Sequence, residues 1–414
     1  MPMPEPLAIV RAVHFAACLA ALGTAAFMLL VGRLDGLDRQ FRRFAAAALA
    51  VALLSGVLWF ALVAARILAL PVSEALGDGG LISVVTDTRF GRIAIIRLAL
   101  VVLAAAALAL PRGRWPAVGA TTALTGAIAW TGHAGAGTGL LGAVHLISDV
   151  AHLIAASLWL GGLPAFASLL VWSRGAPAPG DLAARVTRRF SLLAIGCVLA
   201  LLTSGIINSA VLLGWPTDLL ASAYGRVLVL KLALFAAMLG LAAFNRYRLT
   251  SRLPGRGALD ALAGTTLVET VLGLGILVLV GILGTLAPAS HLHKPTAAIN
   301  PDAAFVHIHT EVVMADLTID PGYAGTSAAI IRLWHEDYAP FAADRVQLAL
   351  DPTFSGAAGI RHDARQLPDG TWVIENLRIQ SPGVWTARVI IERKGTATVL
   401  DAPIVITQCS NECR

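Results

Sequence analysis

Three polar side chains interrupt an otherwise apolar stretch, GAVHLISDVAHLIAASLWLGG, at residues 142–162. His145, Asp149 and His152 are spaced i, i+4 and i+7, which places all three on one face of a helix. Imidazole is a ligand for copper, zinc and haem iron, and a nearby carboxylate can orient a ring by accepting its N–H. Ionisable groups in apolar segments are costly, which makes this face a candidate functional site.

Other soft metal ligands fall at a comparable depth in the apolar runs. His14 lies about seven residues into the first run, with Cys18 one turn further along the same face. His133 follows the fourth run in WTGHAGAG, where glycines let the backbone approach a ligand closely. Imidazole with a nearby thiol favours copper or zinc over magnesium or calcium. We therefore predict one metal-binding set: His14, Cys18, His133, His145 and His152.

The remaining polar groups in the apolar runs carry weaker signals. Glu269 needs a partner, and Asn245 or Arg246 is nearest to it in depth. Basic side chains near the outer ends, Arg11, Arg97 and Lys231, can extend toward the membrane surface. A polar residue on such a helix also often bonds only to a neighbouring helix. As groups that support the site or line a pathway, we select Asp149, Trp159, Lys231, Asn245 and Glu269.

The composition indicates an integral membrane protein. Of 414 residues, 57% are hydrophobic and 14% charged, and the mean hydropathy is +0.76. Eight apolar runs are candidates to span the membrane: 7–31, 44–66, 93–110, 115–131, 142–171, 190–213, 227–246 and 265–287. Arginine follows the first run rather than preceding it, so we expect a retained span rather than a signal peptide. The sequence gives no support for nucleic-acid binding, an HExxH zinc protease or a Walker-type ATPase.

The arginines predict the orientation. One set of alternate loops carries most of them: Arg33, Arg39, Arg42, Arg43, Arg112, Arg114, Arg174, Arg185, Arg188, Arg189, Arg246, Arg248, Arg252 and Arg256. The other loops carry only Arg66, Arg89, Arg92 and Arg226. By the positive-inside rule, both termini lie outside the cytoplasm, and the histidines lie in the outer half of the membrane or beyond it.

The first four runs resemble the second four. GRIAIIRLAL (91–100) matches GRVLVLKLAL (225–234), and an Arg-Phe and a Ser-Gly pair recur in the second and sixth runs. The same alignment pairs His14 with His152. We predict a tandem parallel 4+4 repeat, with repeats at about 7–131 and 142–287. Transporters often place substrate at such an interface, so we expect the two rings to face each other at similar depth.

The C-terminal part has a different pattern. A Pro- and Ala-rich linker, 288–304, follows the membrane domain of residues 1–287. Short alternating runs separated by PGYAG, PDG and SPG then fill residues 305–414 and predict an Ig-like β-sandwich. The whole chain is thus expected to be an all-α polytopic membrane bundle with an extracytoplasmic β-sandwich.

This tail offers a second set of metal ligands. His307 and His309 alternate with apolar residues and so share one strand face. A solvated strand face is the simpler interpretation of this pattern. The alternative is a second metal site formed with nearby histidines: His291, His293, His307, His309 and His335. Cys409 and Cys413 would lie in an oxidising compartment, where they predict a disulfide or, alternatively, a copper-capture site.

Taken together, these motifs resemble the CopD family of bacterial copper-resistance membrane proteins. The resemblance is carried by HLIAASLWLGGLPAF (152–166), RFSLLAIGCVLALLTSGIIN (189–208), YGRVLVLKLALFAAMLGLAAFNRYRL (224–249) and the LVET of the eighth run. The combination of H-x6-W-x-GG, YGR-x4-K and a terminal Asn-Arg is its most specific element. The first four runs match more loosely.

The resemblance implies copper transport across the inner membrane, in the direction of import, for copper homeostasis or resistance. It also implies a CopC-like periplasmic copper carrier as a partner beside the lipid bilayer. The residues alone support only capture of a soft metal or haem from outside. Two alternatives therefore stay open: a redox protein with b-type haem between His14 and His152, and a copper chaperone for oxidase assembly. We predict no catalytic residues.

Overall fold

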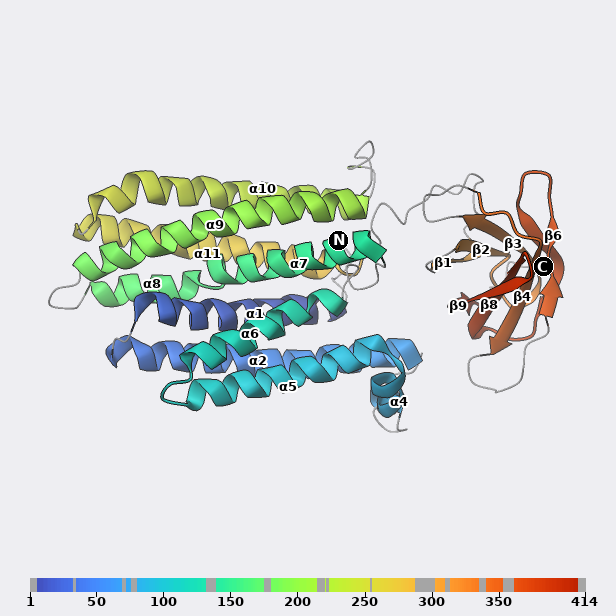
Figure 1. Cartoon of the computed structure of the whole chain (residues 1–414), viewed down its shortest axis with the longest axis horizontal. Coiled ribbons are helices and arrows are strands. Elements are labelled where there is room, and N and C mark those ends of the chain that lie inside the picture. The colour runs from blue at the N-terminus through green and yellow to red at the C-terminus, as the bar shows by residue number, and fades with distance from the viewer. Residues whose placement is uncertain are drawn as a thin grey trace. The chain divides into compact units, whose positions relative to one another are not determined.

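The structure is a computed structural model that describes residues 6–32, 35–68, 72–75, 80–131, 139–174, 180–213, 220, 223–253, 255–286, 302–309, 313–334, 340–352 and 361–408. The chain divides into two compact units, residues 1–293 and 294–414. The first is a bundle of long apolar helices and the second is built from antiparallel sheet (Figure 1).

The helical unit contains the predicted apolar runs. Its helices are α1 (Pro6–Val31), α2 (Asp35–Leu68), α3 (Val72–Ala75), α4 (Gly80–Asp87), α5 (Arg89–Ala109), α6 (Arg114–Ala127), α7 (Gly139–Trp159), α8 (Leu163–Ser173), α9 (Gly180–Leu213), α10 (Ala223–Phe244) and α11 (Arg256–Leu283). We call residues 6–131 the first half of this unit and residues 139–286 the second half.

Seven described segments are long and apolar enough to cross a membrane, where the sequence predicted eight. The exception is the predicted span 115–131. There α6 has 14 residues, about 21 Å at 1.5 Å per residue, against an apolar layer of about 30 Å. The chain after α6 tightens into a 3-10 turn, Ala129–Thr131. Helix α6 nevertheless contacts α1, α5 and α7 within the bundle.

Arginines at one end of the bundle satisfy the carbonyls at helix C-termini. Arg114 donates to the Met28 carbonyl at 3.1 Å near the end of α1, and it pairs with Asp38. Arg42 also pairs with Asp38 and donates to the carbonyls of Leu108 and Leu110 at the end of α5. Basic groups are favoured at these ends because the terminal carbonyls lack partners within the helix. Two of the arginines from which the orientation is predicted, Arg42 and Arg114, thus also hold helix ends together.

Helices α7 and α8 form one span with a break at residues 160–162. There Gly161 N–H bonds to the Ala156 carbonyl at 3.3 Å, and Gly162 N–H bonds to the Trp159 carbonyl at 3.2 Å. The break packs directly on α1, because a Cβ on Gly23 would overlap the Gly161 backbone and a Cβ on Gly161 would overlap the Leu19 carbonyl. Glycine is required here for close approach of two backbones.

The second unit contains two antiparallel sheets. Its strands are β1 (Ala304–His309), β2 (Met314–Asp320), β3 (Gly325–Trp334), β4 (Arg345–Pro352), β5 (Arg361–Asp363), β6 (Arg365–Gln366), β7 (Trp372–Ile379), β8 (Gly383–Arg393) and β9 (Thr396–Ile406). One sheet has the order β1-β2-β3-β7-β6 and the other β5-β4-β8-β9. Buried residues of both sheets, including Leu317, Ile331, Leu348 and Val389, belong to one hydrophobic cluster.

Candidate functional site

His14 on α1 is fixed by a serine on α2. Its Nδ1 lies 3.1 Å from Ser55 Oγ. The Ser55 hydroxyl lies 2.6 Å from the Val51 carbonyl, which can only accept, so the hydroxyl proton is used there. Ser55 Oγ must therefore accept from the ring. This assigns the proton of His14 to Nδ1 and the lone pair to Nε2.

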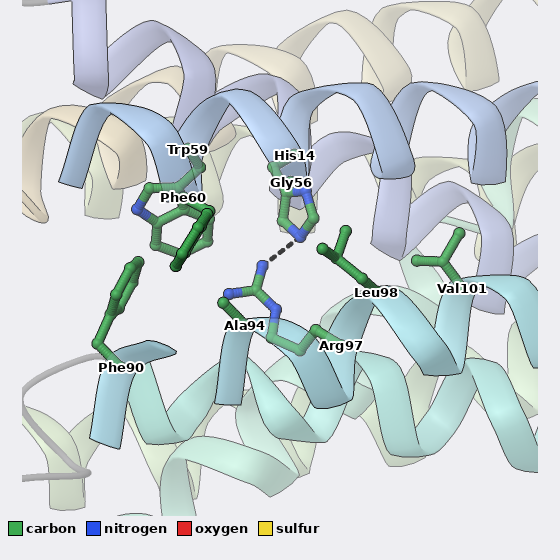
Figure 2. A pocket seen from close by; sticks show the side chains of 9 residues that line it. All are labelled: His14, Gly56, Trp59, Phe60, Phe90, Ala94, Arg97, Leu98 and Val101. Atoms are coloured by element: carbon green, nitrogen blue, oxygen red, sulfur yellow. Dashed lines mark hydrogen bonds between the residues drawn. The ribbon is translucent and has the colours of Figure 1, made fainter. Parts of the chain in front are cut away.

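The lone pair of His14 is capped in the first half. Arg97 on α5 donates its Nη2 N–H to Nε2, as the dashed line in Figure 2 shows. The Cys18 sulfur lies 3.4 Å from the same nitrogen. The Arg97 guanidinium also lies 4.4 Å from the centre of the Trp59 ring. Arg97 is only 4% exposed, so it turns into the bundle and does not extend to the membrane surface as the sequence suggested.

His152 on α7 has the same arrangement in the second half. Its Nδ1 lies 2.9 Å from Ser204 Oγ on α9, and the Ser204 hydroxyl lies 2.5 Å from the Ala200 carbonyl. The same reasoning assigns the proton to Nδ1 and the lone pair to Nε2. Within the described part of the chain, Nε2 of His152 has no hydrogen-bond partner. The residue one turn below is Ala156, where His14 has Cys18.

Asp149 is hydrogen-bonded to α9 rather than to the ring of His152. It accepts a hydrogen bond from the Asn208 amide at 3.3 Å, while Ser204 takes the ring N–H of His152. Lys231 on α10 acts electrostatically on both Asp149 and His152. The second half thus carries a carboxylate and an ammonium group that interact electrostatically near its histidine.

Of the predicted metal ligands, the structure brings His14 and Cys18 into contact. The hydrogen bonds of His14 run to α2 and α5, and that of His152 runs to α9, so each ring is held within its own half. His145 is buried near the start of α7. His133 lies outside the described residues. Among the described residues, no group of three or more His, Cys, Asp or Glu side chains is placed to hold one metal ion.

Glu269 on α11 has the predicted partner Asn245. Asn245 donates its amide to Glu269 Oε1 at 3.2 Å, and both side chains are buried. Arg246, the other partner considered, donates to Ser191 Oγ at 2.6 Å. Asn245 begins a π-helical turn, Asn245–Leu249, a geometry that is often found at functional sites.

Trp159, the last residue of α7, is buried and lies edge-on to Phe235, with ring centres 6.1 Å apart. It therefore lies in the packed interior beside the α7–α8 break. The sequence selected it as a supporting or pathway residue, and the contact identified here is with an aromatic ring.

The second unit brings one predicted ligand into a polar cluster. His307 Nδ1 lies 2.5 Å from Asp316 Oδ1, and Trp334 donates its indole N–H to Asp316 Oδ2 at 3.3 Å. His309 pairs with Met314 in the strand register. The structure does not describe the other predicted groups of this region: His291, His293, His335, Cys409 and Cys413. Nor does it describe the side chain of His309.

The sequence identified the histidines but not the residues that hold them. Ser55 and Ser204 entered only as repeated Ser-Gly pairs, and Asn208 was not selected at all. A signal was present: each serine begins a Ser-Gly pair, and a Cβ on Gly56 would meet His14 Cε1 at 3.1 Å. The small residue makes room for the ring, and the serine beside it fixes the ring nitrogen.

Comparison with known proteins identifies the family. Residues 184–283 match the family described as Copper resistance protein D, and residues 3–143 match Copper resistance protein D-like, N-terminal domain. The chain is 31% identical over 218 residues to Copper resistance protein D of Pseudomonas syringae pv. tomato, which covers 49% of this chain and 70% of that protein. The chain belongs to the CopD family. The resemblance noted in the sequence is thereby confirmed.

Two other relatives extend the comparison. Copper transport protein CutJ of Bacillus subtilis (strain 168) is 27% identical over 408 residues, 92% of this chain and 70% of CutJ. Inner membrane protein YebZ of Escherichia coli (strain K12) is 31% identical over 170 residues, 41% of this chain and 58% of YebZ. No solved structure matches the chain significantly.

Proposed function

We propose that this CopD-family protein transports copper across the bacterial inner membrane, taking it from the periplasm. The names of the relatives support the metal, the process and the membrane: copper transport for CutJ and inner membrane for YebZ. The loop arginines support an orientation with both termini in the periplasm. Transport toward the cytoplasm, in homeostasis or resistance, is the direction that we propose.

One observation carries the proposal. In each half, a histidine, buried in the first half and partly buried in the second, donates its Nδ1 proton to a serine on the following span and so presents Nε2 as a lone pair. Neutral imidazole is a good copper ligand, and a partner that fixes its tautomer raises metal affinity. His152 Nε2 has no hydrogen-bond partner among the described residues, so we propose it as the ligand that receives copper first.

We propose that the other predicted ligands also bind copper, in steps separate from that at His152. His145 lies seven residues before His152 on α7, about 10 Å along the helix, so the two act in succession rather than on one ion. His14 and Cys18 supply an imidazole and a thiol 3.4 Å apart, a pair suited to Cu(I) once Arg97 moves. His133 is proposed as a further ligand at the outer mouth.

We further infer that the helical unit is a 4+4 repeat. The support is that residues paired by the sequence alignment make the same contact in each half: His14 with Ser55, and His152 with Ser204. Gly23 and Gly161, nine residues after the two histidines, pack on each other.

For the second unit, we infer a β-sandwich. The support is that its two sheets share one hydrophobic cluster. We propose that this unit captures copper through the predicted histidine set that includes His307, alone or with a CopC-like carrier.

The haem alternative is less well supported by this geometry. A b-type haem needs Nε2 of both rings directed at one iron, whereas Nε2 of His14 accepts a hydrogen bond from Arg97. A chaperone would bind copper without moving it across the membrane. One uptake experiment therefore distinguishes the chaperone alternative from transport.

The test is copper accumulation in sealed vesicles containing the full-length protein. We expect uptake above empty vesicles for the wild type and for His362→Ala, a histidine of β5 outside the proposed path. His152→Ala should lower the rate at least tenfold. Equal uptake by His152→Ala and wild type would refute the role of His152. Stoichiometric copper binding without accumulation would replace transport with the chaperone function.

A further inference from the structure

The first half of the helical unit contains two arginines, Arg11 and Arg97, that pair with no carboxylate among the described residues. Arg97 and Arg11 approach the same indole ring, with guanidinium carbons 4.4 and 5.3 Å from the centre of Trp59. Neither arginine has an ion pair within the described part of the chain. The Nε atom of each is buried without a hydrogen-bond partner. A charge in a low-dielectric interior strongly favours a nearby counterion.

Arg97 lines a cavity beside these groups. The cavity lies between α2 and α5, and its walls include His14, Trp59, Phe60 and Phe90 (Figure 2). Arg97 and His14 are the ionisable residues of this lining, and the other walls are aromatic, aliphatic or glycine. Aromatic rings present positive edges, which tolerate an anion. With a single guanidinium and no cluster of hydroxyl or amide donors, the cavity suits a small monovalent anion better than phosphate.

The second half shows what is missing from the first. At the position aligned with Arg11 it has Asp149, and this carboxylate acts electrostatically on Lys231, which aligns with Arg97. In the second half, therefore, the protein supplies the negative charge itself. In the first half, no described carboxylate pairs with Arg11 or Arg97, so an anion from solution can supply that charge.

We propose that the cavity between α2 and α5 binds a small inorganic anion of halide size, held by the guanidinium of Arg97. The anion compensates the charge that Asp149 compensates in the second half. The proposal concerns the copper-free protein and stands apart from the transport function.

The experiment uses the copper-free, full-length protein in neutral detergent at constant ionic strength, with gluconate replaced stepwise by chloride or bromide. We expect the unfolding temperature to rise saturably by a few degrees, because an anion that binds only the folded state stabilises it. Lys231→Gln, the aligned position in the second half, should keep this response. Arg97→Gln should lose it.

A second measurement does not depend on a variant that folds. Chloride-35 NMR of the wild type should show line broadening that bromide reverses by competition. No saturable response of the wild type to halides would overturn the proposal. An unchanged response in Arg97→Gln would do so too, as would displacement by inorganic phosphate or phosphatidylglycerol vesicles at concentrations where bromide has no effect.

Discussion

The two halves of the helical unit build the same histidine–serine pair in different electrostatic surroundings. In the first half the ring of His14 lies among arginines, and its Nε2 is capped by Arg97. In the second half the ring of His152 lies near Asp149 and Lys231, and its Nε2 carries no cap among the described residues. Both halves keep the serine that fixes the ring, but their charged neighbours differ. As a result, the aligned histidines present one Nε2 that is occupied by Arg97 and one that has no hydrogen-bond partner among the described residues, which we call the open imidazole.

A substitution at the contact between the halves should have the largest effect. We expect Gly161→Ala to lower stability by about 1–3 kcal/mol, because its Cβ would overlap the Leu19 carbonyl on α1. The measurement is the unfolding temperature in detergent, where about 2–4 °C corresponds to 1 kcal/mol in a chain of this order of size.

Gly196 on α9 is the matched control. A Cβ there meets nothing within 4 Å, and alanine is a better helix former by up to about 1 kcal/mol. Gly196→Ala should therefore be neutral or stabilising. Equal unfolding temperatures for Gly161→Ala and Gly196→Ala would show that the two halves do not depend on this close contact.

The next largest effect should come from removal of the serines that fix the histidine tautomers. The loss of copper affinity should differ between the two halves. We expect Ser204→Ala to weaken copper binding by about 10–100-fold, as is typical for loss of a group that orients a metal-binding histidine. Ser55→Ala should have a smaller effect, because Arg97 already occupies His14 Nε2. Competition titration with a Cu(I) chelator provides both affinities.

Ser204→Thr keeps the hydroxyl and is expected to bind copper nearly as the wild type does. A larger loss of copper affinity in Ser55→Ala than in Ser204→Ala would contradict the proposed difference between the two histidines. Nitrogen-15 NMR of labelled histidine adds a direct reading, since both rings should carry the proton on Nδ1.

Removal of Arg97, which caps Nε2 of His14, should have a smaller effect than removal of Ser204 and should strengthen copper binding rather than weaken it. We expect Arg97→Gln to raise Cu(I) binding at His14 and Cys18 by about tenfold, since a cation next to the metal site costs on the order of 1 kcal/mol or more at short range. The readout is copper stoichiometry and affinity in a His152→Ala background, where this site is seen alone. Unchanged or weaker binding in Arg97→Gln would mean that Arg97 does not compete with the metal.

The smallest effect on copper affinity should come from a substitution of Glu269 on α11. Glu269 is buried and bonded to Asn245, away from the contacts of either histidine. Glu269→Gln keeps the shape and a partner for Asn245, so copper affinity should stay within about twofold of wild type. A loss of affinity in Glu269→Gln would link this pair to the copper site. The uptake assay then tests whether the carboxyl acts later in transport.

The sequence predicted most of the fold because hydrophobic periodicity and loop charge are local signals. It overestimated α6 because an apolar run does not reveal where a helix tightens into a 3-10 turn. The predicted span 142–171 is one apolar segment, Gly142–Ser173, but the sequence did not predict its break at Gly161 and Gly162, where α1 packs closely.

The candidate site was predictable only in part. Histidines in apolar runs are rare enough to select from sequence, and the alignment of His14 with His152 located both. The partners of the rings were not predictable, because serine occurs widely and only packing decides which helix faces the ring. Arg97 was expected to extend outward, yet the acceptor on His14 and the ring of Trp59 hold it inside.

The central claim is that the open imidazole of the second half is the first copper ligand. Cu(I) titration of full-length His152→Ala and His14→Ala, each against the wild type, tests it most directly. We predict that His152→Ala loses the tightest site and that His14→Ala keeps it. Retention of the tightest site by His152→Ala, with its loss in His14→Ala, would contradict the account.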